Sequence, residues 1–249
     1  LEAYPGFGKT VACLNIISRK KTSTLILLHK TSLIKQWQDK IEEFLNVNEL
    51  PPSYIDKKGR TKKRKSVVGI IHGAKDTSTG IIDIAMVGSL NKDNNWHERL
   101  KEYGLVIVDE AHHVASDTIT SVLKQIRATY VYGVTATTKR YDGLQEINYM
   151  FIGPKRFSYT SKNMKRDNDF ERILIPRFTS TVYHNGKDKI DTNEAYELIR
   201  NNEICNEIIT EDIGKAIRNN RTILVLSKFT KHAQTIYERL HNKADHVLL

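Results

Sequence analysis

The chain contains 249 residues, of which 39% are hydrophobic and 27% are charged, and its formal net charge is +10. This length and apolar content predict one large or two ordinary packed domains, and they exclude a disordered tail, a collagen and a coiled coil. The longest mainly apolar runs, residues 25–28 and 81–87, are too short to cross a bilayer. Only Cys13 and Cys205 are present, so we expect no disulfide framework and no cysteine-based zinc site, and a reducing, cytoplasmic location fits best.

A short segment, residues 57–65, holds most of the positive charge. It contains seven of the 39 Lys and Arg residues and no acidic residue. A concentrated cationic loop is a candidate contact for a polyanion such as nucleic acid. The alternative is a solvated surface loop without a partner. The basic residues are Lys57, Lys58, Arg60, Lys62, Lys63, Arg64 and Lys65.

Short β-rich runs alternate with helical stretches from residue 1 to about residue 153. The nearly continuous apolar runs predict parallel strands that helices cover on both faces. Apolar residues at helical spacing predict helices between them. This alternation predicts an α/β fold with a doubly wound parallel sheet. The expected strands are 24–28, 66–71, 81–87, 105–109 and 130–135, and the expected helices begin at Lys9 and cover 31–46 and 116–127.

The rest of the chain changes character. Residues 154–192 are expected to form a connector, with an extended run over 173–180 and a turn at Asn185-Gly186. Residues 193–249 are expected to open a second α/β unit that is too short to close its own sheet. Its expected elements are a long helix over 193–219 capped by Thr192, a strand over 222–227, a helix over 230–242 and a strand from His246.

Residues 3–10 form a phosphate-binding pattern, which we call the phosphate loop. They match G-x-x-x-x-G-K-[ST], except that Ala3 replaces the first glycine, and the preceding strand is not apparent in the sequence. In such a loop, backbone N–H groups turn toward the phosphates and the next helix directs its positive end at them. Lys9 would supply a charge and Thr10 would ligate Mg²⁺. A glycine-rich turn before an ordinary helix is the alternative. The candidate ATP-binding residues are Pro5, Gly6, Phe7, Gly8, Lys9 and Thr10.

Two further motifs follow apolar strands. Asp109 and Glu110 end the strand 105–109, where ligands of open α/β sheets bind. Asp109 would hold Mg²⁺, and Glu110 would orient and deprotonate the attacking water, so Lys9, Asp109 and Glu110 are the candidate catalytic residues. An acidic helix N-terminus is the alternative. Thr135-Ala136-Thr137 ends the strand 130–135, and its hydroxyls are expected to contact His112 and to relay the nucleotide state.

These motifs, in this order, resemble those of the superfamily 2 DEAD/DEAH-box helicases, and most of all the branch of XPB-like translocases and restriction-system motors. The phosphate loop is similar to motif I, residues 109–112 to motif II in its DEAH form, and residues 135–137 to motif III. Residues 25–33 and 82–90 resemble the nucleic-acid motifs of this branch, although His29 and Gly88 stand where Pro and Gln are usual.

The resemblance implies two RecA-like lobes, residues 1–153 and the start of the second from residue 193, that use ATP and Mg²⁺ and bind nucleic acid, with DNA favoured over RNA. Lys30, Thr31 and Ser89 would touch phosphates, and the basic segment 57–65 would add a contact to the same backbone. The arginine finger of the family would lie beyond residue 249, so we expect these residues alone to hydrolyse ATP weakly.

Two other functions remain open. The protein could be a duplex-translocating motor of a restriction or defence system, with a nuclease or another partner. It could also be a non-catalytic nucleic-acid-binding remnant, although the presence of Lys9, Thr10, Asp109 and Glu110 argues against decay.

Overall fold

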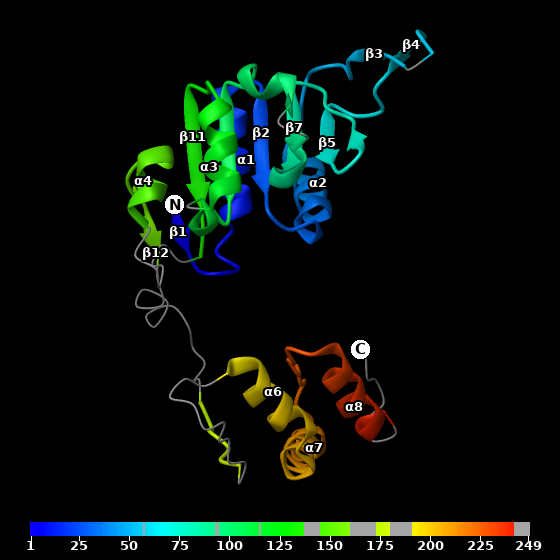
Figure 1. The fold of residues 1–249 in the computed structure, drawn as a ribbon. Helices are drawn as coiled ribbons and strands as arrows, with labels where there is room; N and C mark the ends of the chain where they lie inside the picture. Colours follow the sequence, from blue (N-terminus) through cyan, green and yellow to red (C-terminus); the bar gives the residue numbers. More distant parts are fainter. Residues whose placement is uncertain are drawn as a thin grey trace. The chain divides into compact units, whose positions relative to one another are not determined.

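The computed structural model describes residues 1–56, 58–92, 95–114, 116–136, 145–159, 173–179 and 191–241, and the chain divides into two units, Leu1–Asp169 and Phe170–Leu249 (Figure 1). Four expectations lie outside the described residues: the roles of Lys57 and Thr137, the turn at Asn185-Gly186 and the strand from His246. Among the helices that the structure describes, none is long and apolar enough to pass through a membrane.

A six-stranded sheet forms the centre of the first unit, in the order β11-β10-β2-β7-β5-β6. Five strands are parallel and agree with the predicted runs to within two residues, which confirms the expected RecA-like α/β class. The sixth, β6 (Lys75–Asp76), pairs antiparallel with β5 at one end of the sheet. The parallel strands are β2 (Thr24–Leu28), β5 (Val68–His72), β7 (Ile82–Met86), β10 (Leu105–Asp109) and β11 (Tyr130–Val134).

Helices cover both faces of this sheet (Figure 1). Alternate residues of β2 enter different cores: Ile26 and Leu28 pack with α1 (Lys9–Lys20) and α2 (Ser32–Phe44), and Leu25 and Leu27 pack in the core that contains α3 (Asp117–Gln125). Burial on both faces explains why the strands are continuously apolar. Shorter elements are η1 (Val87–Ser89), η2 (Glu98–Lys101), η3 (Ala111–His113), α4 (Gln145–Ile152), and the antiparallel pairs β3 (Ser53–Ile55) with β4 (Thr61–Lys63) and β8 (Asn91–Lys92) with β9 (Asn95–Trp96).

The parallel strands all end at one edge of the sheet, which we call the carboxyl edge, and begin at the opposite amino edge. A short strand, β1 (Glu2–Ala3), pairs parallel with β12 (Ser158–Tyr159), and Glu2 bridges in parallel to Thr135. A strand therefore does precede the phosphate loop, although it is not apparent in the sequence. Two residues are too few for a periodic pattern, so the sequence could not reveal it.

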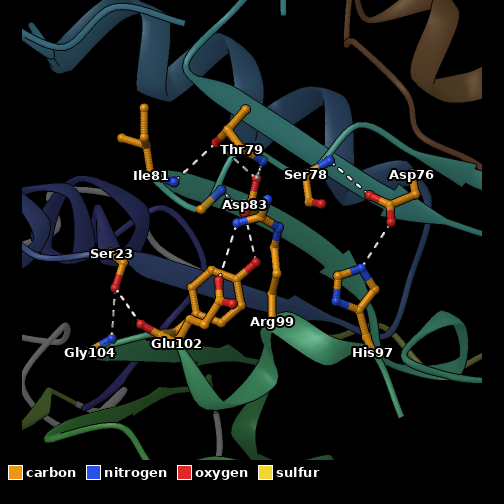
Figure 2. Close-up of polar contacts among 12 residues, drawn as sticks. Ser23, Asp76, Ser78, Thr79, Ile81, Asp83, His97, Arg99, Glu102 and Gly104 are labelled. Atoms are coloured by element: carbon orange, nitrogen blue, oxygen red, sulfur yellow. Dashed lines mark hydrogen bonds and ion pairs between the residues drawn. The ribbon is translucent and has the colours of Figure 1, made fainter. Parts of the chain in front are cut away.

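A buried polar network fixes the amino edge (Figure 2). The Asp83 carboxylate is fully buried and accepts hydrogen bonds from Thr79 N (2.8 Å), Thr79 Oγ1 (3.1 Å), Gly80 N (2.8 Å) and Tyr103 Oη (2.7 Å). Burial first, and then Asp83, raise the pKa of Tyr103, so its hydroxyl remains a donor. Ser23 Oγ donates to the Glu102 carbonyl (2.9 Å). Buried hydrogen bonds to Asp83 thus hold the segment that leads into β7, and the exposed bond from Ser23 joins the segments that lead into β2 and β10.

The described residues of the second unit form three helices: α6 (Thr192–Asn201), α7 (Glu203–Arg218) and α8 (Thr230–Leu240). The single helix predicted over 193–219 is wrong, because Asn202 interrupts it and its side chain caps α7 by accepting from Cys205 N. Asp191, not Thr192, caps α6, and its carboxylate accepts from the backbone N–H groups of Asn193 and Glu194. The described residues of the runs 173–180 and 222–227 form no strand, since neither has a ladder partner among the described residues.

Candidate nucleotide site

The carboxyl edge of the first unit gathers most of the predicted site residues. The phosphate loop follows β1, Lys30 and Thr31 follow β2, and Ser89 follows β7 in η1. The acid pair ends β10, and Thr135 follows β11. Residues that are remote in sequence meet at this edge because parallel strands present their carboxyl ends together.

The backbone of the phosphate loop has the geometry of an anion-binding turn. Gly6 and Gly8 have φ angles of +88° and +94°, which L side chains rarely adopt, so both positions require glycine. Gly8 is the N-cap residue of α1. The first N–H groups of a helix have no partner within the helix and carry its positive dipole end. The loop therefore presents backbone donors where an anion would bind.

Lys9 lies at the start of α1, and its ammonium reaches back into the loop. Its Nζ donates to the carbonyl oxygens of Ala3 (2.8 Å) and Tyr4 (3.2 Å). The same charge acts on Asp109, where it lowers the carboxyl pKa and so opposes part of the effect of burial. Lys9 and Asp109 therefore interact electrostatically, as a shared phosphate and cation site requires.

Asp109 is a half-buried carboxylate with two internal donors. Oδ2 accepts from Trp37 Nε1 (2.9 Å), and Oδ1 accepts from the backbone N–H of Glu110 (2.9 Å). Burial raises the pKa of Asp109, and the two hydrogen bonds act in the opposite direction. A desolvated carboxylate is stabilised by a cation, and each of its oxygens retains a lone pair. Asp109 and the hydroxyl of Thr10 are thus suitable donors for Mg²⁺.

Trp37 is the residue of this site that the sequence analysis missed. The sequence pattern placed it on the apolar stripe of a helix, and it is indeed only 1% exposed within that core. A fully buried indole N–H requires an acceptor, and the structure supplies the Asp109 carboxylate. The missed signal was therefore the polar group of a tryptophan on an otherwise apolar stripe.

Glu110 has an unusual backbone and a buried carboxylate oxygen. Its φ of +51° is left-handed, which is uncommon for a residue other than glycine and often marks a functional position. Its Oε2 is buried and forms no hydrogen bond with the described part of the protein, although His112 Nδ1 lies 3.2 Å away. Glu110 can therefore accept a hydrogen bond from a further group such as water.

The expected contact between β11 and His112 is present. His112 Nδ1 lies 2.9 Å from Thr135 Oγ1, and Ala136 follows, half-buried. The His113 ring lies between those of His112 and His29, with centroid distances of 4.1 Å and 4.3 Å. Burial lowers the pKa of His29, which favours a neutral ring. These tilted rings connect the end of β2 with the acid pair, and the coupling role of His112, Thr135 and Ala136 stays a prediction.

The predicted nucleic-acid residues do not all lie together. Lys30 and Thr31 are exposed at the carboxyl edge, and Ser89 Oγ accepts from Gly73 N (2.7 Å) there. The basic segment instead connects the C-terminal end of α2 with the start of β5, which places it at the amino edge. The segment therefore does not lie beside Lys30, Thr31 and Ser89, and the expectation that it contacts the same nucleic-acid backbone stays a prediction.

A separate cavity of 460 Å³ lies among α1, β11 and α4. Its lining includes Cys13 and Ile16 of α1 and all of β11, but none of the catalytic candidates Lys9, Asp109 and Glu110. Burial raises the pKa of the Cys13 thiol to about 12, so it stays protonated. This cavity therefore has apolar character and does not form the candidate site.

The chain is similar in sequence to a known protein family and to known proteins. The family model described as "Type III restriction enzyme, res subunit" matches residues 1–140. Over 95% of its length, the chain is 29% identical to an Acanthamoeba polyphaga mimivirus protein named as an ATP-dependent RNA helicase, and it covers 43% of that protein. Over 60% of its length, it is 30% identical to the DNA 3'-5' translocase XPB2 of Sulfurisphaera tokodaii, and it covers 29% of that protein.

Among solved structures, the Hef helicase domain of Pyrococcus furiosus is similar to 97% of the chain at 15% identity, with a TM-score of 0.48. The chain covers 50% of that structure. It also spans about half or less of the length of the two relatives described above.

Proposed function

The chain belongs to the family described as type III restriction enzyme, res subunit, and from this premise we propose that the whole protein is a nucleic-acid-dependent ATPase. It would couple ATP hydrolysis to movement along DNA, or RNA, as a helicase or translocase. One observation carries this proposal: a loop with glycine-specific geometry places Lys9 at the same edge of the sheet as Asp109, a residue from a distant part of the sequence that ends a central strand.

Each residue of the site has a role that its surroundings support. The N–H groups of the phosphate loop and the ammonium of Lys9 would bind the β- and γ-phosphates. Thr10 and Asp109 would hold Mg²⁺, which neutralises phosphate charge when it is bound. Glu110 would accept the proton of the attacking water, since it has a buried oxygen with free acceptor capacity among the described groups. Pro5 and Phe7 would shape the loop, and the Phe7 ring packs 5.1 Å from that of Tyr159.

Coupling to nucleic acid would use the neighbouring elements of the same edge. Lys30, Thr31 and Ser89 would contact phosphates independently of sequence. His112, Thr135, Ala136 and Thr137 would sense the state of the nucleotide beside Glu110, and the 2.9 Å contact between His112 and Thr135 supports this role.

We also propose that residues 109–112 act as a DEAH-type motif and that residues 1–249 alone hydrolyse ATP slowly. The relatives are at least about twice as long as the chain, and groups from their remaining parts would be missing. An arginine supplied to the phosphates is worth about 10³–10⁵ in rate.

The family description favours a second candidate, a motor that translocates along duplex DNA in a restriction or defence system and acts with a nuclease. The test measures displacement by the whole protein with ATP and Mg²⁺. A helicase is expected to displace a strand from a partial DNA duplex, whereas a duplex motor would displace only a third strand from a triplex. If nucleic acid does not stimulate hydrolysis and neither strand is displaced, the protein is a non-catalytic remnant and the proposal fails.

Replacing Trp37 with phenylalanine removes the donor to Asp109 and keeps an aromatic ring. We expect the Mg²⁺ concentration for half-maximal hydrolysis to rise about 10-fold, because groups that orient a metal ligand typically contribute that much. The measurement is a Mg²⁺ titration of nucleic-acid-stimulated hydrolysis at a temperature where both proteins are folded.

Trp96→Phe is the matched control, because Trp96 packs against the other core of the sheet. Its Mg²⁺ titration should match that of the unchanged protein. Equal effects of the two substitutions would show that Trp37 acts only through packing.

A further inference from the structure

The β3–β4 hairpin, residues 53–65, carries the basic segment at the amino edge. The chain reaches it from the C-terminal end of α2 and leaves it toward the start of β5. Figure 1 shows β3 and β4 beyond the end of the sheet that lies opposite β1. A ligand at the phosphate loop, Lys30 or Ser89 and a ligand on this hairpin would therefore occupy opposite edges of the same sheet.

Asp56 holds the turn of the hairpin in a defined shape. Its Oδ1 accepts from the backbone N–H groups of Lys58 and Arg60, both at 2.9 Å. Its backbone N–H donates to the Arg60 carbonyl (2.9 Å), and at the base Arg64 N donates to the Pro52 carbonyl (2.8 Å). The basic side chains are thus presented by an ordered two-stranded element rather than by a loose loop.

The two faces of the hairpin differ in charge compensation. On one face, the Arg64 guanidinium lies 4.2 Å from the centre of the Tyr54 ring, and Lys62 Nζ lies 3.0 Å from Asp56 Oδ2. Arg60 also pairs with Asp56 (3.1 Å). The cations of this face therefore already have partners within the hairpin, either the Asp56 carboxylate or the Tyr54 ring.

The opposite face is uncompensated. The register pairs Ser53 with Lys63, so Lys63 lies on the face that is not that of Tyr54. Lys58 lies in the turn of the hairpin, and Lys65 lies just beyond the end of β4. Lys58, Lys63 and Lys65 are exposed, and none forms an ion pair with the described residues. Lys63 is the last residue of β4, and Lys65 follows it by two residues in the segment that leads to β5.

We propose that Lys58, Lys63 and Lys65 form a second nucleic-acid-binding surface, which grips the phosphate backbone and raises affinity without taking part in ATP coupling. Lysine ammonium groups act as point charges and suit phosphates without reading sequence. Protein interfaces need an apolar centre, whereas this face offers one large apolar side chain, Ile55. The choice of nucleic acid rests on the proposed function, but the position and the charge of the surface do not.

The test replaces Lys58, Lys63 and Lys65 together with glutamine in the whole protein. Binding of a fluorescein-labelled 30-base-pair DNA duplex is measured over a salt series by fluorescence anisotropy. We expect Kd at low salt to rise at least about 10-fold, because phosphate contacts supply much of the affinity. Each lost phosphate contact should also make the plot of log K against log salt less steep by about 1. At saturating DNA, kcat for ATP hydrolysis should remain unchanged.

A charge-matched control replaces Lys101, Lys124 and Lys215, which are exposed elsewhere, with glutamine, and it should keep the original Kd and slope. Equal effects of the two triple variants, or no change in the hairpin variant, would overturn the proposal. A fall in kcat at saturating DNA would also overturn it, since the surface would then belong to the coupled site. If DNA binding depends on the hairpin but DNA never stimulates hydrolysis, the proposed function is wrong, whereas the proposal of a nucleic-acid-binding surface on the hairpin is supported.

Discussion

Replacing Lys9 with alanine is expected to lower nucleic-acid-stimulated ATP hydrolysis by the whole protein at least about 100-fold, because one preorganised group at the reacting centre typically contributes 10²–10³ in rate. Lys9 is the cation of the phosphate loop, and it also acts on the Asp109 carboxyl. The substitution removes both effects. The measurement is the steady-state rate of phosphate release at saturating nucleic acid, made once with excess ATP and once with limiting ATP.

The control for this variant is Lys35→Ala, which makes the same substitution on the exposed side of α2. Among the described residues, Lys35 forms an ion pair with its helix neighbour Asp39 (2.6 Å), and such exposed pairs contribute little. Its rate should equal that of the unchanged protein. Since Lys9 also donates to two loop carbonyls, circular dichroism and a melting curve must show that the variant is folded. A folded Lys9→Ala protein with normal stimulated hydrolysis would rule out the ATPase proposal.

The second large effect is expected for Glu110→Gln, which should separate binding of ATP from its hydrolysis. Glutamine preserves the size of the side chain but cannot accept a proton, and general-base groups contribute about 10²–10⁴ in rate. Hydrolysis should fall by that factor. The affinity for a fluorescent ATP analogue with Mg²⁺ should stay within about 3-fold, since Lys9, Thr10 and Asp109 are unchanged.

Glu43→Gln on α2 is the matched control, because Glu43 is exposed and pairs with Lys40 at 2.6 Å. It should affect neither binding nor hydrolysis. If Glu110→Gln instead abolished nucleotide binding, Glu110 would be a binding residue and its assignment as the base would be wrong. If the variant hydrolysed ATP normally, another group would have to take the proton.

Much of the first unit could be predicted because its signals are local. The backbone conformation of the phosphate loop requires glycine at two positions of a short motif, so the motif is visible in the sequence. Continuous apolar runs identified all five parallel strands. Once those strands are taken as parallel, their carboxyl ends must meet at one edge. The expected neighbourhood of Asp109, Glu110 and Thr135 follows from that rule alone, whereas the place of Lys9 was expected from the motif of the phosphate loop.

The signals failed where an element was too short or had no partner. β1 contains two residues, and it forms only because β12 and Thr135 lie beside it. The run 222–227 has the composition of a strand but finds no ladder among the described residues. The break at Asn202 depends on a cap that competes with continued helix, and helical periodicity continues across it without a visible interruption.

Local sequence was thus sufficient for the α/β class, the parallel strands and the motifs of the candidate nucleotide site, since periodicity and backbone preference act over a few residues. Contacts between remote segments required the folded chain. Only folding joins Trp37 to Asp109 and His29 to His113, because α2, β2 and β10 must first pack together. The same is true of the basic hairpin, whose charge is plain in the sequence. Its place at the amino edge follows from the direction in which α2 returns across the sheet.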